Sequence, residues 1–108
     1  MVTRQDVDRI VDATRDAATR AQTRILSIGV LKEHVHVVFS FLPQTTISAF
    51  VRHAKSESAR RANLRRAGEG VLRWARGYYA GSLSKSHVQA ARIYVGQQYR
   101  RHPDLIPE

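Results

Sequence analysis

Residues 24–41, RILSIGVLKEHVHVVFSF, decide the fold, because they contain two apolar runs that are rich in β-branched residues. The first run predicts a strand at about residues 23–31, and the second predicts a strand at about residues 34–41. Only two residues separate them, so we expect an antiparallel hairpin, although a Lys-Glu pair is not a favoured hairpin turn. Within the first strand, Gly29 is the candidate for a β-bulge.

The second strand carries two histidines two positions apart. In a β-strand, residues i and i+2 point to the same face, so the imidazoles of His34 and His36 should lie side by side. Val35, Val37 and Phe39 should then face the hydrophobic core. Two neutral imidazoles on one rigid surface make half of a divalent-metal site. An isolated His-x-His pattern, however, is more often structural or part of a surface.

The rest of the chain predicts the other layers of the domain. Helical spacing of apolar residues predicts helices at about residues 5–21 and 46–66, and a third from near residue 86 to just before residue 103. A short strand is predicted near residues 78–82. This order indicates one α+β domain over residues 1–108, with an antiparallel sheet and its first two helices on one face. The histidines would then lie on the opposite, open face, which the last helix can approach.

The composition favours a partner that is a polyanion. The 108 residues include 18 Lys and Arg against 9 Asp and Glu, a formal net charge of +9, and nucleic acid is the default ligand for such an excess. Cysteine is absent, which excludes disulfides and thiolate metal sites. We find no apolar run long enough for a membrane span and no signal peptide, so we expect a cytoplasmic, nucleoid-associated protein. The second helix carries the basic residues for which we predict DNA contacts, a solvated surface being the alternative: Arg52, Lys55, Arg60, Arg61, Arg65 and Arg66.

Tyr94 and Gln98 are four residues apart, so that on a helix their side chains are neighbours. A tyrosine hydroxyl can attack a phosphodiester and keep the energy of the broken bond in a phosphotyrosine linkage. Because a phenol is mostly protonated at neutral pH, the reaction needs activation, which a divalent cation at the scissile phosphate can supply. His34, His36 and the amide oxygen of Gln98 could bind that cation, Mg²⁺ or Mn²⁺. Taken singly, Tyr94 is more often a half-buried helix residue, and Gln98 is uninformative.

Four stretches together resemble the single-tyrosine transposases of small insertion sequences, the IS200-like members of the HUH endonuclease superfamily. Residues 31–38 match the His-hydrophobic-His strand that gives the superfamily its name, and residues 94–98 match its Tyr-x-x-x-Gln nucleophile motif. Residues 47–58, with a Lys-x-x-Ser pattern, and residues 74–82 resemble the two segments between them. The resemblance covers about residues 6–102.

The resemblance implies a ferredoxin-like fold with a C-terminal tyrosine-bearing helix, and it implies a function. Such enzymes cut single-stranded DNA at hairpin-bearing transposon ends, form a 5′-phosphotyrosine and leave a free 3′-hydroxyl, which later reverses the step at a new partner strand. Carried over to this sequence, Tyr94 is the nucleophile, and His34, His36 and Gln98 are the metal ligands. The resemblance also implies a homodimer, in which the tyrosine helix of one subunit can serve the histidines of the other.

The sequence departs from the family pattern at its start. The family usually begins with a β-strand before the first helix, whereas only Met1–Arg4 precede the helix here. A truncated or decayed copy, a start assigned too late, or strand pairing supplied by a partner chain would explain this difference. Glu33 also stands where the family usually has Asp.

Two alternative functions remain open. One is a non-catalytic DNA-hairpin binder, either a remnant or a domesticated transposase. The other is an RNA-binding domain of the ferredoxin-like type, although the histidine strand lacks the aromatic, glycine-rich stacking signature of such domains.

Overall fold

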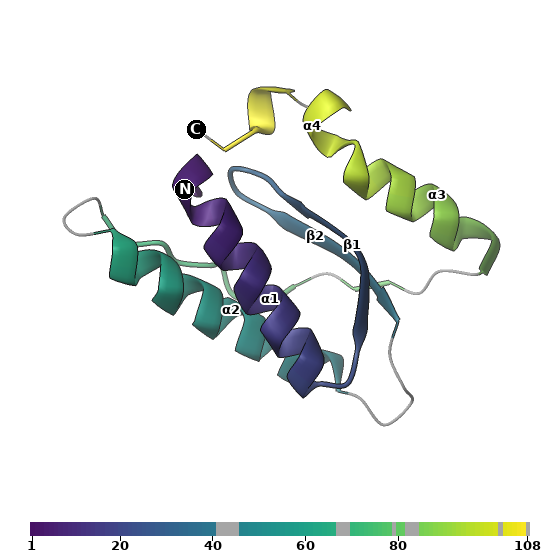
Figure 1. The fold of residues 1–108 in the computed structure, drawn as a ribbon, viewed down its shortest axis with the longest axis horizontal. Helices are drawn as coiled ribbons and strands as arrows, with labels where there is room; N and C mark the ends of the chain where they lie inside the picture. The colour runs from purple at the N-terminus through teal and green to yellow at the C-terminus, as the bar shows by residue number, and fades with distance from the viewer. Residues whose placement is uncertain (41–45, 67–69, 79, 82–84, 102, 108) are drawn as a thin grey trace.

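The computed structural model describes residues 1–40, 46–66, 70–78, 80–81, 85–101 and 103–107. A central hairpin of two strands separates a pair of long helices from the helices near the C-terminus (Figure 1). The elements are η1 (a 3-10 helix, Arg4–Asp6), α1 (Val7–Arg20), β1 (Arg24–Val30), β2 (Val35–Ser40), α2 (Ile47–Arg65), α3 (Lys85–Gly96), α4 (Gln98–Arg101) and η2 (Pro103–Leu105). None of the described helices is both long enough and apolar enough to cross a bilayer.

β1 and β2 form the antiparallel hairpin that the sequence predicted. The bulge, however, is not at Gly29, which pairs directly with His36. The register shifts between Ile25 and Ser27, so Leu26 is the extra residue. Because directly paired residues of neighbouring strands point to the same face of a sheet, Gly29 lies beside His36.

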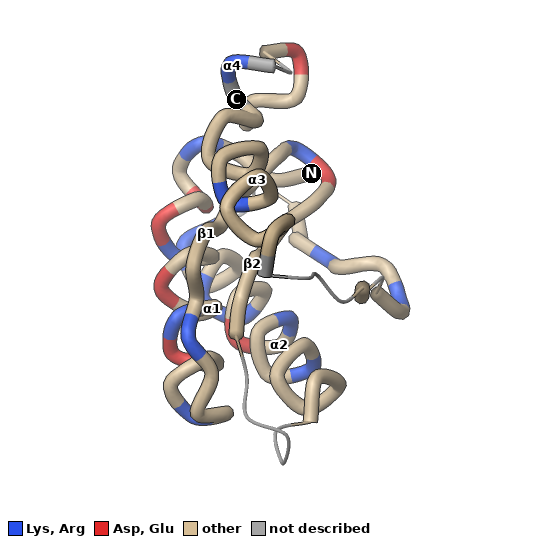
Figure 2. Tube along the Cα trace, turned by 90° about the vertical axis from the view of Figure 1, so that its right-hand side faces the viewer, with Lys and Arg blue, Asp and Glu red and all other residues tan. Residues whose placement is uncertain are grey.

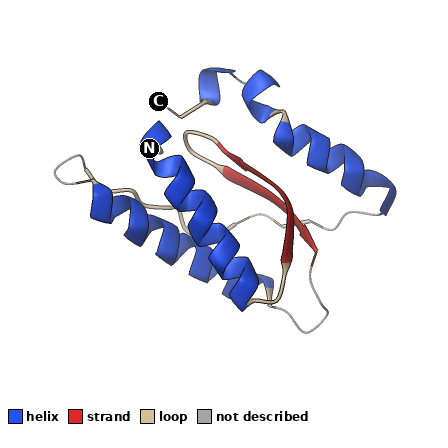
Figure 3. Cartoon of the chain, in the orientation of Figure 1, coloured by secondary structure: helices blue, strands red, loops and turns tan. Residues whose placement is uncertain are grey.

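Two apolar clusters join the hairpin to the helical layer. α1 and α2 cover one face of the sheet, and α3 lies across the other (Figures 1 and 3). In one cluster the ring of Phe50 from α2 packs on Phe39 of β2, with ring centroids 5.2 Å apart. The buried members of the other cluster come from the N-terminal segment, α1, β1, α2 and the segment after α2: Val2, Ile10, Val30, Ala62 and Leu72. This arrangement confirms the predicted α+β class, with the first two helices on one face.

The tip of the hairpin lies between the two ends of the chain. The amide of Val2 donates to the carbonyl of Lys32 at 2.9 Å, and the amide of Lys32 donates to the carbonyl of Leu105 at 2.9 Å. Residues 1–3 contain no strand. The hairpin tip therefore fixes both terminal segments to one end of the domain (Figure 1).

The short strand predicted near residues 78–82 is absent from the part of it that the structure describes. Residues 78, 80 and 81 have no regular secondary structure, and residues 79 and 82 lie outside the described residues. Side chains of α2 hold the preceding segment instead of a strand ladder. Asn63 accepts a hydrogen bond from the amide of Leu72 at 2.7 Å and donates one to its carbonyl at 3.1 Å. These bonds attach the segment that precedes residue 78 to α2 and satisfy the backbone groups of Leu72.

The sequence predicted one continuous last helix, but in the structure this helix is interrupted at Gln97. α3 ends at Gly96 and α4 begins at Gln98. The amide of Gln97 is shared between the carbonyls of Ile93 at 3.0 Å and Tyr94 at 3.2 Å. A glycine inside a helix weakens it, which accounts for a break next to Gly96.

A buried ion pair joins the start of α1 to the end of α2. Asp6 has no exposed surface, and its carboxylate accepts hydrogen bonds from the guanidinium of Arg66 and from the amide and hydroxyl of Thr3 at 2.9 and 3.0 Å. Arg66 is also buried, and it donates to the carbonyl of Met1 at 2.7 Å. Burial alone would raise the pKa of Asp6, but the hydrogen bonds from Arg66 and Thr3 outweigh it and hold the pKa well below its usual range.

Candidate active site

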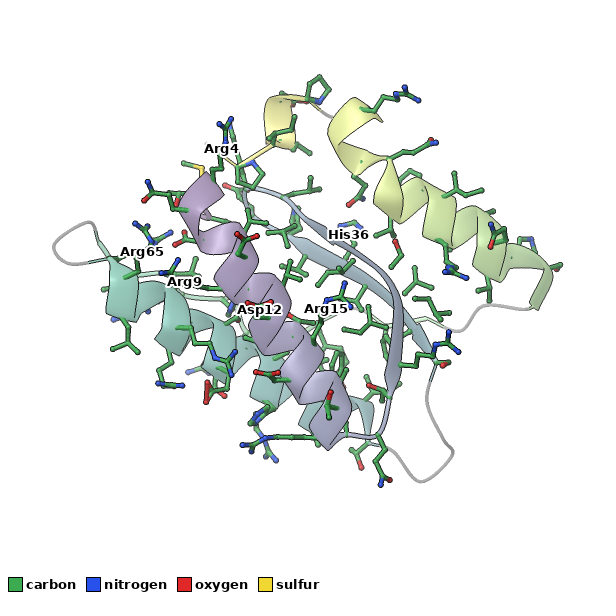
Figure 4. All side chains as sticks on the ribbon, viewed as in Figure 1. Arg4, Arg9, Asp12, Arg15, His36 and Arg65 are labelled. Carbon is green, nitrogen blue, oxygen red and sulfur yellow. The ribbon has the colours of Figure 1, made fainter. Side chains whose placement is uncertain are left out.

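The two histidines lie together on the face of the hairpin that is turned away from α1 and α2. His34 immediately precedes β2 and His36 lies within it, and both residues are exposed. Their ring centroids are 6.1 Å apart. Figure 4 shows His36 projecting toward the C-terminal helices. The side-by-side placement that the two-residue spacing predicted is confirmed.

Gln98 reaches these histidines from the far end of the chain. Its amide Nε2 lies 3.1 Å from Nδ1 of His36, across 62 residues of sequence. Gln98 is only 2% exposed, although it is a polar residue at the start of a short helix. The structure thus brings together the three residues for which the sequence predicted a shared metal ion.

The chemistry of this donor set fits a divalent cation. Oε1 of Gln98 is buried and has no hydrogen-bond partner among the described residues. A buried polar atom without a partner is costly, so its presence calls for an explanation. Half a turn of the terminal amide exchanges Nε2 and Oε1 and brings the oxygen beside His36. Two imidazole nitrogens and an amide oxygen then form a mixed nitrogen and oxygen set of the kind that Mn²⁺ accepts.

No second candidate metal site is apparent in the described part of the chain. Those residues contain no group of three or more His, Cys, Asp and Glu side chains placed to hold a metal. The amide of Gln98 is therefore what makes the histidine pair a three-donor site.

Tyr94 lies on α3, next to the residue that anchors this helix on the sheet. Val95 is 7% exposed, whereas Tyr94 is 41% exposed. The sequence predicted that Tyr94 and Gln98 share one face of a helix. Their exposures differ because Val95 and Gln98, three positions apart, face the sheet, and because the helix is interrupted at Gln97. The side chain of Tyr94 is therefore accessible to solvent, whereas that of Gln98 is enclosed.

A cavity of about 950 Å³ runs along β2 beside the histidines. Its walls include His34 and His36, the inner side of α2, and the segment that contains Trp74 and Tyr78. The indole N–H of Trp74 donates to Ser58 at 2.8 Å, which holds this wall against α2. Among the described residues β2 pairs only with β1, so the other side of β2 borders this cavity.

The basic residues predicted to bind DNA do not form one uniform surface. Arg52 is exposed, and Arg60 is largely exposed although it pairs with Glu57 at 2.8 Å. Nζ of Lys55 donates to the carbonyl of Ala75 at 2.7 Å and to that of Gly77. The other three contact acidic residues: Arg61 pairs with Asp16 at 2.7 Å, and Arg65 and Arg66 contact Asp6. Figure 2 shows basic and acidic positions interleaved along α1, where Asp16 lies.

Two comparisons with known proteins found similar sequences. A family model described as "Transposase IS200 like" matches residues 1–98, a range that includes both histidines, Tyr94 and Gln98. The chain is also similar to the ISDra2 transposase TnpA of Deinococcus radiodurans, with 37% identity over 54 residues. That stretch covers 50% of this chain and 39% of the relative, so the chain matches only about two fifths of the relative's length.

Proposed function

We infer the function from one premise: the chain belongs to the family of IS200-like transposases. We propose that it is a metal-dependent endonuclease and strand transferase that acts on single-stranded DNA at hairpin-bearing transposon ends. The observation that carries the proposal is the contact between Gln98 and His36, with the buried Oε1 of Gln98 unpaired in the described part of the chain. Turning the amide so that Oε1 faces His36 would place this oxygen beside the imidazole, where it could bind the same cation.

In this proposal Tyr94 is the nucleophile of a balanced transesterification. Its Oη attacks the scissile phosphorus, a new P–O bond to tyrosine forms, and the bond between phosphorus and O3′ breaks. The phenol proton leaves to solvent, and the departing 3′-oxygen gains a proton. Attack by the 3′-hydroxyl of another strand later reverses the step and restores the tyrosine. No bond energy is lost to water, so no external energy source is required.

His34, His36 and Gln98 would hold Mg²⁺ or Mn²⁺ in this scheme. A cation bound there would polarise the scissile phosphate and lower the cost of the charge that develops on it. The exposed Arg52 and Arg60 would attract the DNA backbone, a contribution that weakens as salt is added. We also propose a homodimer, which sedimentation of the purified protein would test.

The direct test is covalent capture. Purified protein is incubated with a labelled hairpin-bearing single strand and Mn²⁺, then denatured and resolved on a gel. We expect a protein–DNA adduct that survives denaturation, requires the cation and does not form with a fully duplex strand. Hairpin binding without any adduct would contradict the nuclease and favour a non-catalytic DNA-hairpin binder.

His36→Ala is expected to weaken Mn²⁺ binding at least about tenfold, because it removes one of three proposed ligands. His36 is exposed, so the fold should survive the change. Calorimetric titration measures the affinity. His53→Ala is the matched control, because His53 lies on α2 outside the three-residue site and should leave the affinity unchanged. Equal affinity in wild type and His36→Ala would reject this ligand.

A further inference from the structure

Gly29 lies where residues of α3 and α4 pack closely against the sheet. A Cβ added to Gly29 would lie 2.8 Å from Oε1 of Gln98 and 3.0 Å from the carbonyl oxygen of Val95. Both distances are shorter than ordinary van der Waals contacts, which are about 3.5–4.0 Å. The missing side chain of Gly29 is therefore the space into which Gln98 fits.

Ser27, two positions earlier on β1, makes a second contact with the same helix. Its hydroxyl donates to the carbonyl of Arg92 on α3 at 3.2 Å. Val95 of α3 is buried between the helix and the sheet. Ser27 and Gly29 therefore form a low platform on β1 on which α3 rests, and we call this pair the helix seat.

The pairing of the strands explains why the helix seat matters for the site. Gly29 is the direct cross-strand partner of His36, so a side chain that rests on Gly29 necessarily lies next to the imidazole of His36. Gln98 does so, with 3.1 Å between its Nε2 and Nδ1 of His36. A larger residue at position 29 would lift the amide away from the histidine.

We propose that Gly29 is a positioning residue, which sets the approach of α3 and α4 to the sheet and thereby places the Gln98 amide against His36. The reason is space and not backbone freedom, because the described glycines with positive φ are Gly70 and Gly77 only. An alanine can therefore adopt the backbone of position 29. The role of Gly29 in docking α3 does not depend on the proposed function, whereas its effect on metal binding rests on that function.

The test compares Gly29→Ala with Gly96→Ala, a glycine on the opposite side of the same interface. A Cβ at Gly96 would lie 4.0 Å from the Ser27 hydroxyl, an ordinary contact. Hydrogen exchange of the α3 amides measures docking, and calorimetric titration measures Mn²⁺ affinity. We expect Gly29→Ala to lower α3 protection and Mn²⁺ affinity about tenfold or more, while α1 and α2 keep their protection. Gly96→Ala should lower neither quantity, and because alanine favours a helix over glycine it should raise α3 protection slightly.

Ser27→Ala serves as a second, milder variant in case Gly29→Ala does not fold. Loss of its hydrogen bond to Arg92 should lower α3 protection by about 2- to 10-fold. Wild-type α3 protection in Gly29→Ala would overturn the proposal, as would an equal loss in Gly96→Ala. If α3 protection falls in Gly29→Ala but the wild type binds no Mn²⁺, the helix seat stands and the metal site of the proposed function fails.

Discussion

Tyr94→Phe is expected to abolish the covalent protein–DNA adduct, with a loss of roughly three orders of magnitude or more, as for other nucleophile deletions. The change removes one hydroxyl and leaves the ring. Tyr94 is 41% exposed, so we expect the fold and hairpin binding to stay within about twofold of wild type. Adduct yield on denaturing gels and hairpin affinity by fluorescence anisotropy measure the two effects separately.

Tyr78→Phe is the matched control for this experiment. Tyr78 is 53% exposed and lines the cavity that also contains both histidines. The Tyr78→Phe variant should retain full adduct formation. An adduct that persists in Tyr94→Phe but disappears in Tyr78→Phe would assign the nucleophile to the other tyrosine and contradict the mechanism.

Asp6→Asn is expected to destabilise the protein by about 3–5 kcal/mol, because removing one partner of a buried ion pair leaves the other charge buried and uncompensated. Asp6 has no exposed surface and Arg66 is 7% exposed. Urea unfolding followed by circular dichroism measures the loss. Asp16→Asn is the control, since the pair that Asp16 forms with Arg61 lies at the surface and should contribute at most about 1 kcal/mol. Equal losses in the two variants would contradict the role given to the buried pair.

The same carboxylate makes stability depend on acid. The pKa of Asp6 is lowered in the folded protein, so the unfolded chain binds the proton more readily. The stability that ionised Asp6 contributes is fully present above the pKa of the unfolded residue, about 4. This stability is lost as the pH falls toward the lower pKa of the folded state. We expect wild type to lose stability below about pH 4 more steeply than Asp6→Asn, as unfolding at a series of pH values would show.

The parts of the fold that follow local periodicity could be predicted from the sequence. The hairpin and the long helices were predicted to within a few residues because a two-residue or a helical repeat of apolar positions states directly which face is buried. The side-by-side placement of His34 and His36 was predicted from the same alternation. Gln98 was predicted as their partner only through a motif, because nothing local links residues 62 positions apart.

The features that depend on tertiary contact could not be predicted. Gly29 suggested a bulge, but the bulge lies at Leu26, and Gly29 instead makes room for a helix from elsewhere in the chain. Asp6 carries no local sign of burial, because its partner Arg66 is 60 residues away. We predicted DNA contact for Arg66, but Arg66 is buried against Asp6. The charge of a residue does not reveal from sequence alone whether its guanidinium meets solvent or an internal carboxylate.

The cavity beside β2 has a consequence for how the protein behaves in concentrated solution. Among the described residues β2 has a strand neighbour on one side only, and such an edge can template pairing with another molecule and so lead to aggregation. The net charge of +9 opposes such encounters by mutual repulsion. High ionic strength is the usual means of removing bound DNA during purification. At 1 M salt it limits the range of that repulsion to a Debye length of about 3 Å. Colloidal stability should therefore be poorest in the buffers that yield the cleanest protein.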